Sequence, residues 1–349
     1  MTRKKKKRTW LRGLAALLLL AALAVAWAGF RLYRQVFRPF RGAGAGIVVR
    51  IENGMSVAAI ARRLQERGVI ASAAQFTRYY RLFHSRSKLK AGEYLFDAPL
   101  SMRQVIAKLE EGKAILRRVT IPEGQWIGET AQALEQAGLF PAAEFVAAAR
   151  DASLVRDIDP EAADLEGYLF PDTYLVQEGI GAPAMAALMV RRFRDNFGQP
   201  FVWRARDIGF SVRQAVILAS LIEKETANRD ERFLISSVFH NRLRKGMLLD
   251  CDSTIVYGLK KAGVYDGDIR WNDLKDDSPY NTRRRRGLPP GPIANPGYAA
   301  LEAALYPENT DFLYFVAKGQ GSHHFSRSLS EHNRAVRQYI LQGGEPGLD

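Results

Sequence analysis

Two carboxylates stand at the end of an apolar stretch, where a desolvated acid could carry out proton transfer. Residues 212–222 are almost wholly apolar and follow Ser211, a favourable N-cap, so they predict a buried helix that ends with Glu223 and Glu225. Burial beside apolar groups raises the pKa of a carboxyl, and a glutamate tuned upward can be a general acid near neutral pH. The pattern therefore indicates an acid/base site at the end of this helix.

Helical spacing distinguishes the two glutamates. Ser220, Ala219 and Val216 lie three, four and seven residues before Glu223, so that face is small-sided and another molecule could approach it. Glu225 continues a bulkier face and is expected to point toward the core. A salt bridge at a helix end is the alternative explanation for a glutamate in such a place. A negative charge there also opposes the helix dipole, which hints at another purpose.

Glycoside cleavage usually needs a second carboxylate beside the acid. Spacing alone does not select this partner. The candidates are Asp172, Asp250, Asp252 and Glu331.

The sequence contains few motifs typical of metal sites or of serine nucleophiles. No H-E-x-x-H pair, G-x-S-x-G elbow, P-loop or dinucleotide fingerprint occurs, so we expect no metal and no cofactor. The single cysteine, Cys251, rules out an intramolecular disulfide and a cysteine-based zinc cluster, and is expected to be a small semi-buried side chain. The histidines are expected to be structural or to contact substrate. They are His84, His240, His323, His324 and His332.

The charge balance points to an anionic partner. The 349 residues carry a net charge of +14, concentrated among the first eight residues and in the run Arg283–Arg286. No basic stripe alternates with aromatic residues, so a nucleic-acid partner is not expected. An anionic membrane surface or an acidic polymer such as a cell wall fits better. The length suggests about two folded domains.

The N-terminal segment predicts a membrane anchor. Residues 13–30 contain no charge and, as a helix, would span roughly 27 Å, close to the thickness of a bilayer core. The basic tail, residues 1–12, is then cytoplasmic, and the chain beyond the 31–46 linker is periplasmic or otherwise extracytoplasmic. A cleaved signal peptide is the alternative, but the apolar run is long for one and ends in large residues. We expect a single-pass protein of the inner (plasma) membrane.

The folded part begins with a pattern that occurs twice. A strand at 47–51, a turn at Gly54 and a helix at about 57–67 closing at a glycine are matched 70 residues later, between 119 and 138. Between the copies the pattern predicts a helix at 73–83, a strand at 91–96 and a helix at 101–111. Residues 47–115 are thus expected to form a small α+β module. Its strand–helix–helix–strand order resembles a LysM-type domain, which implies glycan binding.

Several long motifs occur in a fixed order over nearly the whole chain, to about Ile340. They are LEGYLFPDTY, ASLIEKET, VFHNRL, DSTIVYG, SPYNT, GLPPGPI and EHN. In this order they resemble the endolytic murein transglycosylase family, also called YceG-like. The resemblance implies an α+β fold: a transmembrane helix, a LysM-like module, a mixed α+β catalytic domain at 116–340 and a tail at 341–349.

The resemblance also implies a reaction. The family cleaves the β-1,4 bond between N-acetylmuramic acid and N-acetylglucosamine and leaves a 1,6-anhydro end. Its catalytic glutamate, the first carboxylate of the E-K-E segment, falls on Glu223. The nucleophile is the sugar's own C6 hydroxyl, so one glutamate can act first as acid and then as base, without a partner carboxylate or a metal.

The resemblance further implies partners and contacts. The partners are peptidoglycan glycan strands, the membrane and the peptidoglycan synthases, with the enzyme terminating nascent strands. Polar residues within the motifs are candidates for substrate binding. They are Glu225, Asn241, Asp252, Tyr280, Asn281, His324 and His332.

Two segments depart from the family pattern. The family commonly has Gln and Pro around the D-x-T segment, where this chain reads Asp250-Cys251-Asp252-Ser253-Thr254. It often has an aromatic residue after Asn-Thr, where this chain has Arg283. The arginine run that begins there either contacts anionic stem peptides or forms a solvated loop, and the sequence leaves both open.

Overall fold

The computed structural model describes residues 46–341 apart from 113–115, 178 and 227, together with scattered residues between 19 and 40. Among these residues no helix is both long and apolar enough to cross a bilayer. Several predicted segments lie wholly or partly outside the described residues. They are the tail 1–12, most of the segment 13–30, part of the linker 31–46 and the tail 341–349 beyond its first residue.

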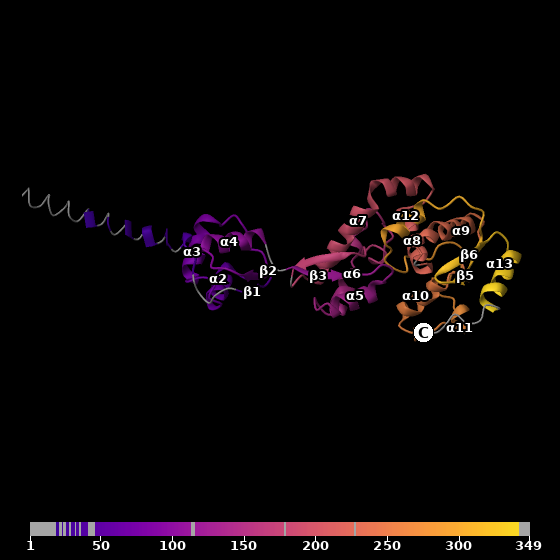
Figure 1. The fold of residues 1–349 in the computed structure, drawn as a ribbon, viewed down its shortest axis with the longest axis horizontal. Coiled ribbons are helices and arrows are strands. Elements are labelled where there is room, and N and C mark those ends of the chain that lie inside the picture. Colours follow the sequence, from indigo (N-terminus) through magenta and orange to yellow (C-terminus); the bar gives the residue numbers. More distant parts are fainter. Residues whose placement is uncertain are drawn as a thin grey trace, which may run out of the picture. The chain divides into compact units, whose positions relative to one another are not determined.

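The described chain is a mixed α+β structure in which helices dominate and the strands form two-stranded sheets (Figure 1). It divides into two compact units. The first comprises residues 1–117 with 176–179, and the second comprises 118–175 with 180–349. The mixed α+β class expected from the sequence is confirmed.

The first unit has the strand–helix–helix–strand order predicted for it. β1 (Ile47–Ile51) pairs antiparallel with β2 (Gly92–Phe96), and α2 (Val57–Glu66) and α3 (Ala73–Phe83) lie between them in sequence. α4 (Met102–Glu111) follows and begins with a capping box at Ser101. The apolar faces of these elements form one core. Its fully buried members include Ala61, Leu64, Phe76, Tyr94, Val105, Ile106 and Leu109.

The predicted repeat is confirmed. α5 (Ile127–Gln136) begins and ends 70 residues after α2. Gly54 and Gly124 both adopt positive φ, +81° and +77°, so each turn uses a conformation that favours glycine. Both helices close in the same way, because Val69 N–H donates to the Leu64 carbonyl and Leu139 N–H to the Leu134 carbonyl. The second copy starts with β3 (Leu116–Thr120), which pairs with β4 (Thr173–Gln177).

A group of helices forms the body of the second unit. α8 (Val212–Glu225), α9 (Arg232–Arg244) and α12 (Tyr298–Leu305) contact one another, and α12 also contacts α7 (Ala182–Asp207), as Figure 1 shows. α7 is broken at Gly198, two residues before Pro200, where the backbone leaves helical geometry. α6 (Ala142–Ala149) packs between α5 and α7.

The rest of the second unit consists of shorter elements. α10 (Asp252–Ala262) contacts α8, and α11 (Trp271–Leu274) is a single turn. The hairpin of β5 (Tyr314–Gly319) and β6 (Ser322–Ser326) is antiparallel, with an irregularity between Ala317 and Gly319, and α13 (Leu329–Val336) packs on it.

Candidate active site

α8 places Glu223 at its C-terminal end. The helix begins with the expected cap: Ser211 Oγ accepts from Gln214 N–H, and the Gln214 side chain accepts from the Ser211 N–H. Every residue from Ala215 to Ile222 is buried, so the helix axis runs through the core. The helix ends with Glu225, as predicted, because Thr226 is extended. The buried helix therefore fixes the position of Glu223.

The Glu223 carboxylate is held by two donors from two other elements. Oε1 accepts from Nη2 of Arg232 at 2.9 Å, and Oε2 accepts from the backbone N–H of Gly297 at 2.9 Å. Arg232 is the first residue of α9, and Gly297 immediately precedes α12. Only 5% of the Glu223 side chain and 4% of the Arg232 side chain are exposed. The carboxylate is thus nearly enclosed and firmly oriented.

Burial raises the pKa of Glu223 above its ordinary value. The Gly297 N–H, the Arg232 guanidinium and the Lys224 ammonium oppose that shift, and the nearby charge of Glu123 adds to it. The balance is upward, which keeps a proton on Glu223 at a higher pH than on an exposed glutamate. That is the property a general acid needs.

Glu123 is a second carboxylate at this site and is not among the candidates predicted from the sequence. Its Oε2 lies 3.6 Å from Nη2 of Arg232, the same nitrogen that donates to Glu223. A Cβ on Gly297 would come within 2.0 Å of Glu123 Oε1, so the Glu123 carboxyl occupies the space beside this glycine. Both carboxylates therefore meet at Gly297 and Arg232. The one available signal was position: Glu123 directly precedes the turn glycine of the second repeat copy.

Asn295 and Glu166 join the loops that carry these groups. The Asn295 side chain accepts from the N–H groups of Gly167 and Leu169, and it donates to the Gln125 carbonyl and to Glu166. The backbone of Asn295 also bonds to that of Gly124 and Gln125. These bonds link the loop of Glu123 to the segment of Gly297.

Glu166 is fully enclosed in this network. Both of its oxygens accept from the Ile127 N–H at 3.1 Å, and Tyr257 Oη donates to one of them at 3.3 Å. Burial raises the pKa of Glu166 to about 8. Glu166 belongs to the motif LEGYLFPDTY but was not singled out from the sequence.

The small-sided face of α8 does not receive another molecule, contrary to the expectation from spacing. Val216, Ala219 and Ser220 are fully buried against the chain itself. Ser220 Oγ accepts from the Ile293 N–H at 3.0 Å, and the α-carbon of Gly167 lies close to Val216 and Pro292. The small residues instead allow the segment before Gly297 to approach the helix and deliver its N–H to Glu223.

Glu225 turns inward, as predicted, but into a polar environment. Its Oε1 accepts from Cys251 Sγ at 2.8 Å and from Ser253 Oγ at 3.1 Å. Burial raises the pKa of both the Glu225 carboxyl and the Cys251 thiol. Cys251 is buried with its proton directed at a carboxylate, so it is not a reactive thiol.

Comparisons with known proteins identify the family. A model of the YceG-like family matches residues 49–338. The chain belongs to the YceG-like family. A relative in Bacillus subtilis (strain 168) named endolytic murein transglycosylase is 33% identical over 313 residues, which cover 85% of this chain and 86% of that protein.

Two further relatives agree. A protein of the same name from Streptococcus pneumoniae serotype 2 is 28% identical over 84% of this chain, which spans 58% of the length of that relative. The crystal structure of a YceG-like protein from Listeria monocytogenes is 33% identical, with a TM-score of 0.57 over 83% of this chain and 98% of that one.

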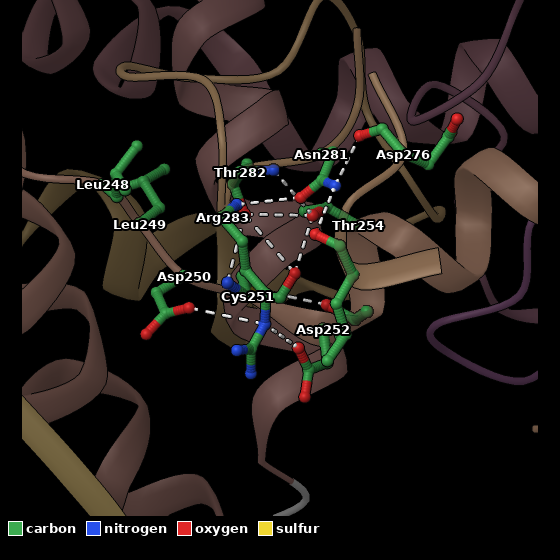
Figure 2. A network of polar contacts seen from close by, with 12 residues as sticks. Leu248, Leu249, Asp250, Cys251, Asp252, Thr254, Asp276, Asn281, Thr282 and Arg283 are labelled. Atoms are coloured by element: carbon green, nitrogen blue, oxygen red, sulfur yellow. Dashed lines mark hydrogen bonds and ion pairs between the residues drawn. The ribbon is translucent and has the colours of Figure 1, made fainter. Parts of the chain in front are cut away.

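The two segments that were expected to depart from the family pattern contact each other. Figure 2 shows Arg283 directed at Asp250 and Asp252, with its Nε 3.4 Å and 2.6 Å from their carboxylates. Thr254 and Thr282 connect the same two segments by a hydroxyl–hydroxyl contact of 3.0 Å. Arg283 thus has two aspartates of the neighbouring segment as ion-pair partners. Asp252 is half-exposed here and begins α10.

The other arginines of the run also have partners within the chain. Arg284 donates to the Lys275 carbonyl, Arg285 to the carbonyls of Asp277 and Ser278, and Arg286 to the Gly246 carbonyl. The run therefore ties neighbouring loops to one another. Arg284, Arg285 and Arg286 are nevertheless exposed, so contact with anionic stem peptides and a solvated loop both stay open as predictions.

Two of the candidate substrate-binding residues use their amides within the protein. Asn241 donates to the carbonyls of Thr310 and Phe312, and Asn281 donates to those of Leu274 and Asp276. Both side chains are almost completely buried. Their observed contacts position loops, and a role in substrate contact stays a prediction.

The remaining candidates lie in two places. Tyr280 packs against Tyr257 with ring centroids 4.9 Å apart, and with Arg213 and Lys261 it lines a cavity of about 250 Å³. His324 lies on β6 beside Tyr339, and His332 on α13 stacks on Tyr314 at 5.3 Å. Burial lowers the pKa of His332, as does the nearby Arg242.

Two of the candidate second carboxylates have structural partners elsewhere. Asp172 pairs with Arg192, and Glu331 accepts from the N–H groups of Arg327 and Ser328 at the start of α13. Glu123 instead shares Arg232 with Glu223.

Proposed function

We propose that this chain is an endolytic murein transglycosylase that uses Glu223 as both acid and base. Membership of the YceG-like family and the names of the Bacillus and Streptococcus relatives support the activity. The observation that carries the residue assignment is the Glu223 carboxyl itself. It is 5% exposed, has a raised pKa and is oriented by Arg232 and Gly297.

The proposed reaction cleaves the β-1,4 bond between N-acetylmuramic acid and N-acetylglucosamine. Glu223 gives its proton to the glycosidic oxygen as the bond from that oxygen to C1 breaks. The C6 hydroxyl of the same muramic residue then attacks C1 and forms the 1,6-anhydro ring, and its proton returns to Glu223. The nucleophile belongs to the substrate, so proximity lowers the barrier and no water is consumed.

Arg232 and the Gly297 N–H have a defined task in this cycle. Between the two proton transfers Glu223 is an anion in a buried place, where an unpaired charge would be costly. Charge-assisted hydrogen bonds from Arg232 and Gly297 stabilise that anion and keep its oxygens in place.

Replacing Glu223 tests the proposal. Glu223→Gln keeps the size of the side chain but removes the transferable proton, so we expect release of anhydro-ended glycan from purified sacculi to fall by at least 100-fold. Mass spectrometry of the digest detects these ends, which are lighter by one water than hydrolytic ends. The matched control is Glu144→Gln, the same change at an exposed position of α6. It should leave release unchanged.

Three results would contradict the proposal. If Glu223→Gln released anhydro-ended glycan as fast as the wild type, Glu223 would not be the acid. Ends that carry the extra water would make the enzyme a hydrolase. No release by the wild-type protein would favour a binding protein that scaffolds other wall enzymes.

We further propose that the enzyme is anchored in the inner (plasma) membrane by residues 13–30, with its N-terminus in the cytoplasm. The uncharged run and the basic cluster before it support this arrangement. The first unit would act as a LysM-like glycan-binding module, which its strand–helix–helix–strand order supports. An anchored enzyme reaches membrane-proximal glycan, where it would terminate strands made by peptidoglycan synthases.

A further inference from the structure

The ion pair between Glu223 and Arg232 poses a problem for the proposed acid. A guanidinium 2.9 Å from a carboxylate stabilises the ionised form, whereas a general acid must start the reaction protonated. The ion pair stabilises Glu223 after it has given up its proton. Before that step, the same ion pair disfavours the protonated form that the acid needs. Another group must therefore bind Arg232 while Glu223 is protonated.

Glu123 is placed to do this. Nη2 of Arg232 lies 2.9 Å from Glu223 and 3.6 Å from Glu123, so one nitrogen faces two carboxylates. With both glutamates ionised, the three side chains carry one net negative charge, and one added proton neutralises them. Two carboxylates that share one cation therefore bind a proton more readily than either alone with it.

Burial decides which carboxylate holds that proton. Glu223 is 5% exposed and Glu123 is 42% exposed. The charged form costs more in the buried place, so burial favours the proton on Glu223. Besides Arg232 and Glu123, Lys224 of α8 acts on Glu223 by its charge, and the N–H of Gly297, just before α12, donates to it.

Arg232 can change partner without losing other bonds. Its Nε and Nη1 are buried and have no hydrogen-bond partner among the residues that the structure describes. A small rotation of the guanidinium from Glu223 toward Glu123 therefore breaks only the bond to Glu223. Most buried arginines are held by several bonds, so this freedom is an unusual feature of the site.

We propose that Glu123 is a positioning residue for the acid step: it takes over the Arg232 guanidinium while Glu223 is protonated and releases it when Glu223 becomes an anion. This proposal rests on the function assigned to Glu223 above. Glu123 neither receives the substrate's proton nor attacks the sugar. It acts through Arg232.

The test is the pH dependence of kcat/KM for release of anhydro ends from purified glycan strands. Activity falls as pH rises through the pKa of Glu223, because the acid is then lost. In Glu123→Gln, Glu223 is the one carboxylate left to pair with Arg232, so the pKa of Glu223 should fall. The alkaline limb should then move to lower pH by about one unit. At pH values above the limb, kcat/KM should be roughly tenfold lower than in the wild type. Arg232→Gln should move the limb to higher pH, and Arg232→Lys should restore it in part.

Gly297→Ala gives an independent variant. Gly297 has a φ of −78°, which alanine adopts without strain, but the new Cβ would overlap the Glu123 carboxyl. It should displace Glu123 from Arg232 and shift the limb in the same direction as Glu123→Gln. The matched control is Glu129→Gln, which removes a carboxylate paired with Lys260 in the same part of the chain and should leave the profile unchanged.

Opposite shifts by Glu123→Gln and Arg232→Gln, in proteins that melt as the wild type does, would support the proposal. An unchanged profile in folded Glu123→Gln would overturn it, as would complete inactivity of that variant at every pH, which would put Glu123 in the reaction itself. These outcomes can be distinguished from a failure of the proposed function, because the assignment of Glu223 as the acid is tested by the activity of Glu223→Gln.

Discussion

Burial and the kind of partner separate Glu223 from the other acidic residues considered for catalysis. Asp250 and Asp252 are half-exposed and share Arg283, whereas Glu225 is buried but receives its hydrogen bonds from a thiol and a hydroxyl. Glu223 alone of these four combines burial with a buried arginine partner and a backbone donor. A carboxyl that must be both a good acid and a stabilised anion needs that combination.

The raised pKa of Glu166 leads to a prediction about stability. Its pKa is about 8 in the folded protein, against 4.5 ordinarily, so between these values the native state holds a proton that the unfolded state has lost. Stability must then fall as pH rises, by up to about 1.4 kcal/mol per pH unit. Glu166→Gln should make this slope shallower, as measured by denaturant unfolding from pH 5 to 8. An equally steep slope in the variant would contradict the assignment.

Sequence patterns located Glu223 but missed its surroundings. The helix, its cap and its terminal glutamates follow from local spacing, and the ordered motifs point to one of the two carboxylates. Glu123 lies 100 residues earlier in the chain, and its contact with Arg232 depends on how α5, α9 and α12 pack. No local periodicity encodes such a contact. For the same reason, spacing suggested an open face at Ser220, which tertiary packing covers.

At the level of elements, the loop that ends in Gly297 matters as much as the helix that bears Glu223. It packs on α8 through Ser220 and is tied to the loop of Glu123 through Asn295. The repeat and the helices of the first unit were predictable because their apolar spacing is regular. The kinked α7 and the irregular segment before α12 were not, because glycine and proline there obey tertiary rather than local constraints.

Asn295→Ala tests the role of this loop. The substitution leaves the N–H groups of Gly167 and Leu169 buried without their acceptor, which should lower the free energy of unfolding by roughly 2–5 kcal/mol. Activity should fall as well, since Gly297 loses its support. Denaturant unfolding measures the first effect. Asn196→Ala, which removes a single bond at the surface of α7, should cost less than about 0.5 kcal/mol. Equal losses in the two variants would refute the role given to Asn295.

At the level of the whole molecule, the place where the enzyme acts depends on whether residues 13–30 stay attached to it. The chain would place its catalytic unit outside the cytoplasm whether the segment is an anchor or a cleaved signal. Only an anchor, however, confines Glu223 to glycan near the membrane. Edman sequencing of the mature protein distinguishes the two: we expect the genetically encoded N-terminus and recovery in the membrane fraction. A mature N-terminus near residue 29 would contradict the anchor.

Labelled water tests the reaction assigned to Glu223, because an intramolecular attack incorporates no oxygen from the solvent. Wild-type protein and Glu223→Gln would digest purified glycan strands in water labelled with heavy oxygen, and mass spectrometry would read the new ends. An intramolecular reaction driven by Glu223 predicts anhydro ends without the label from the wild type, and no new ends from the variant. Labelled reducing ends from the wild type, or anhydro ends from Glu223→Gln, would contradict it.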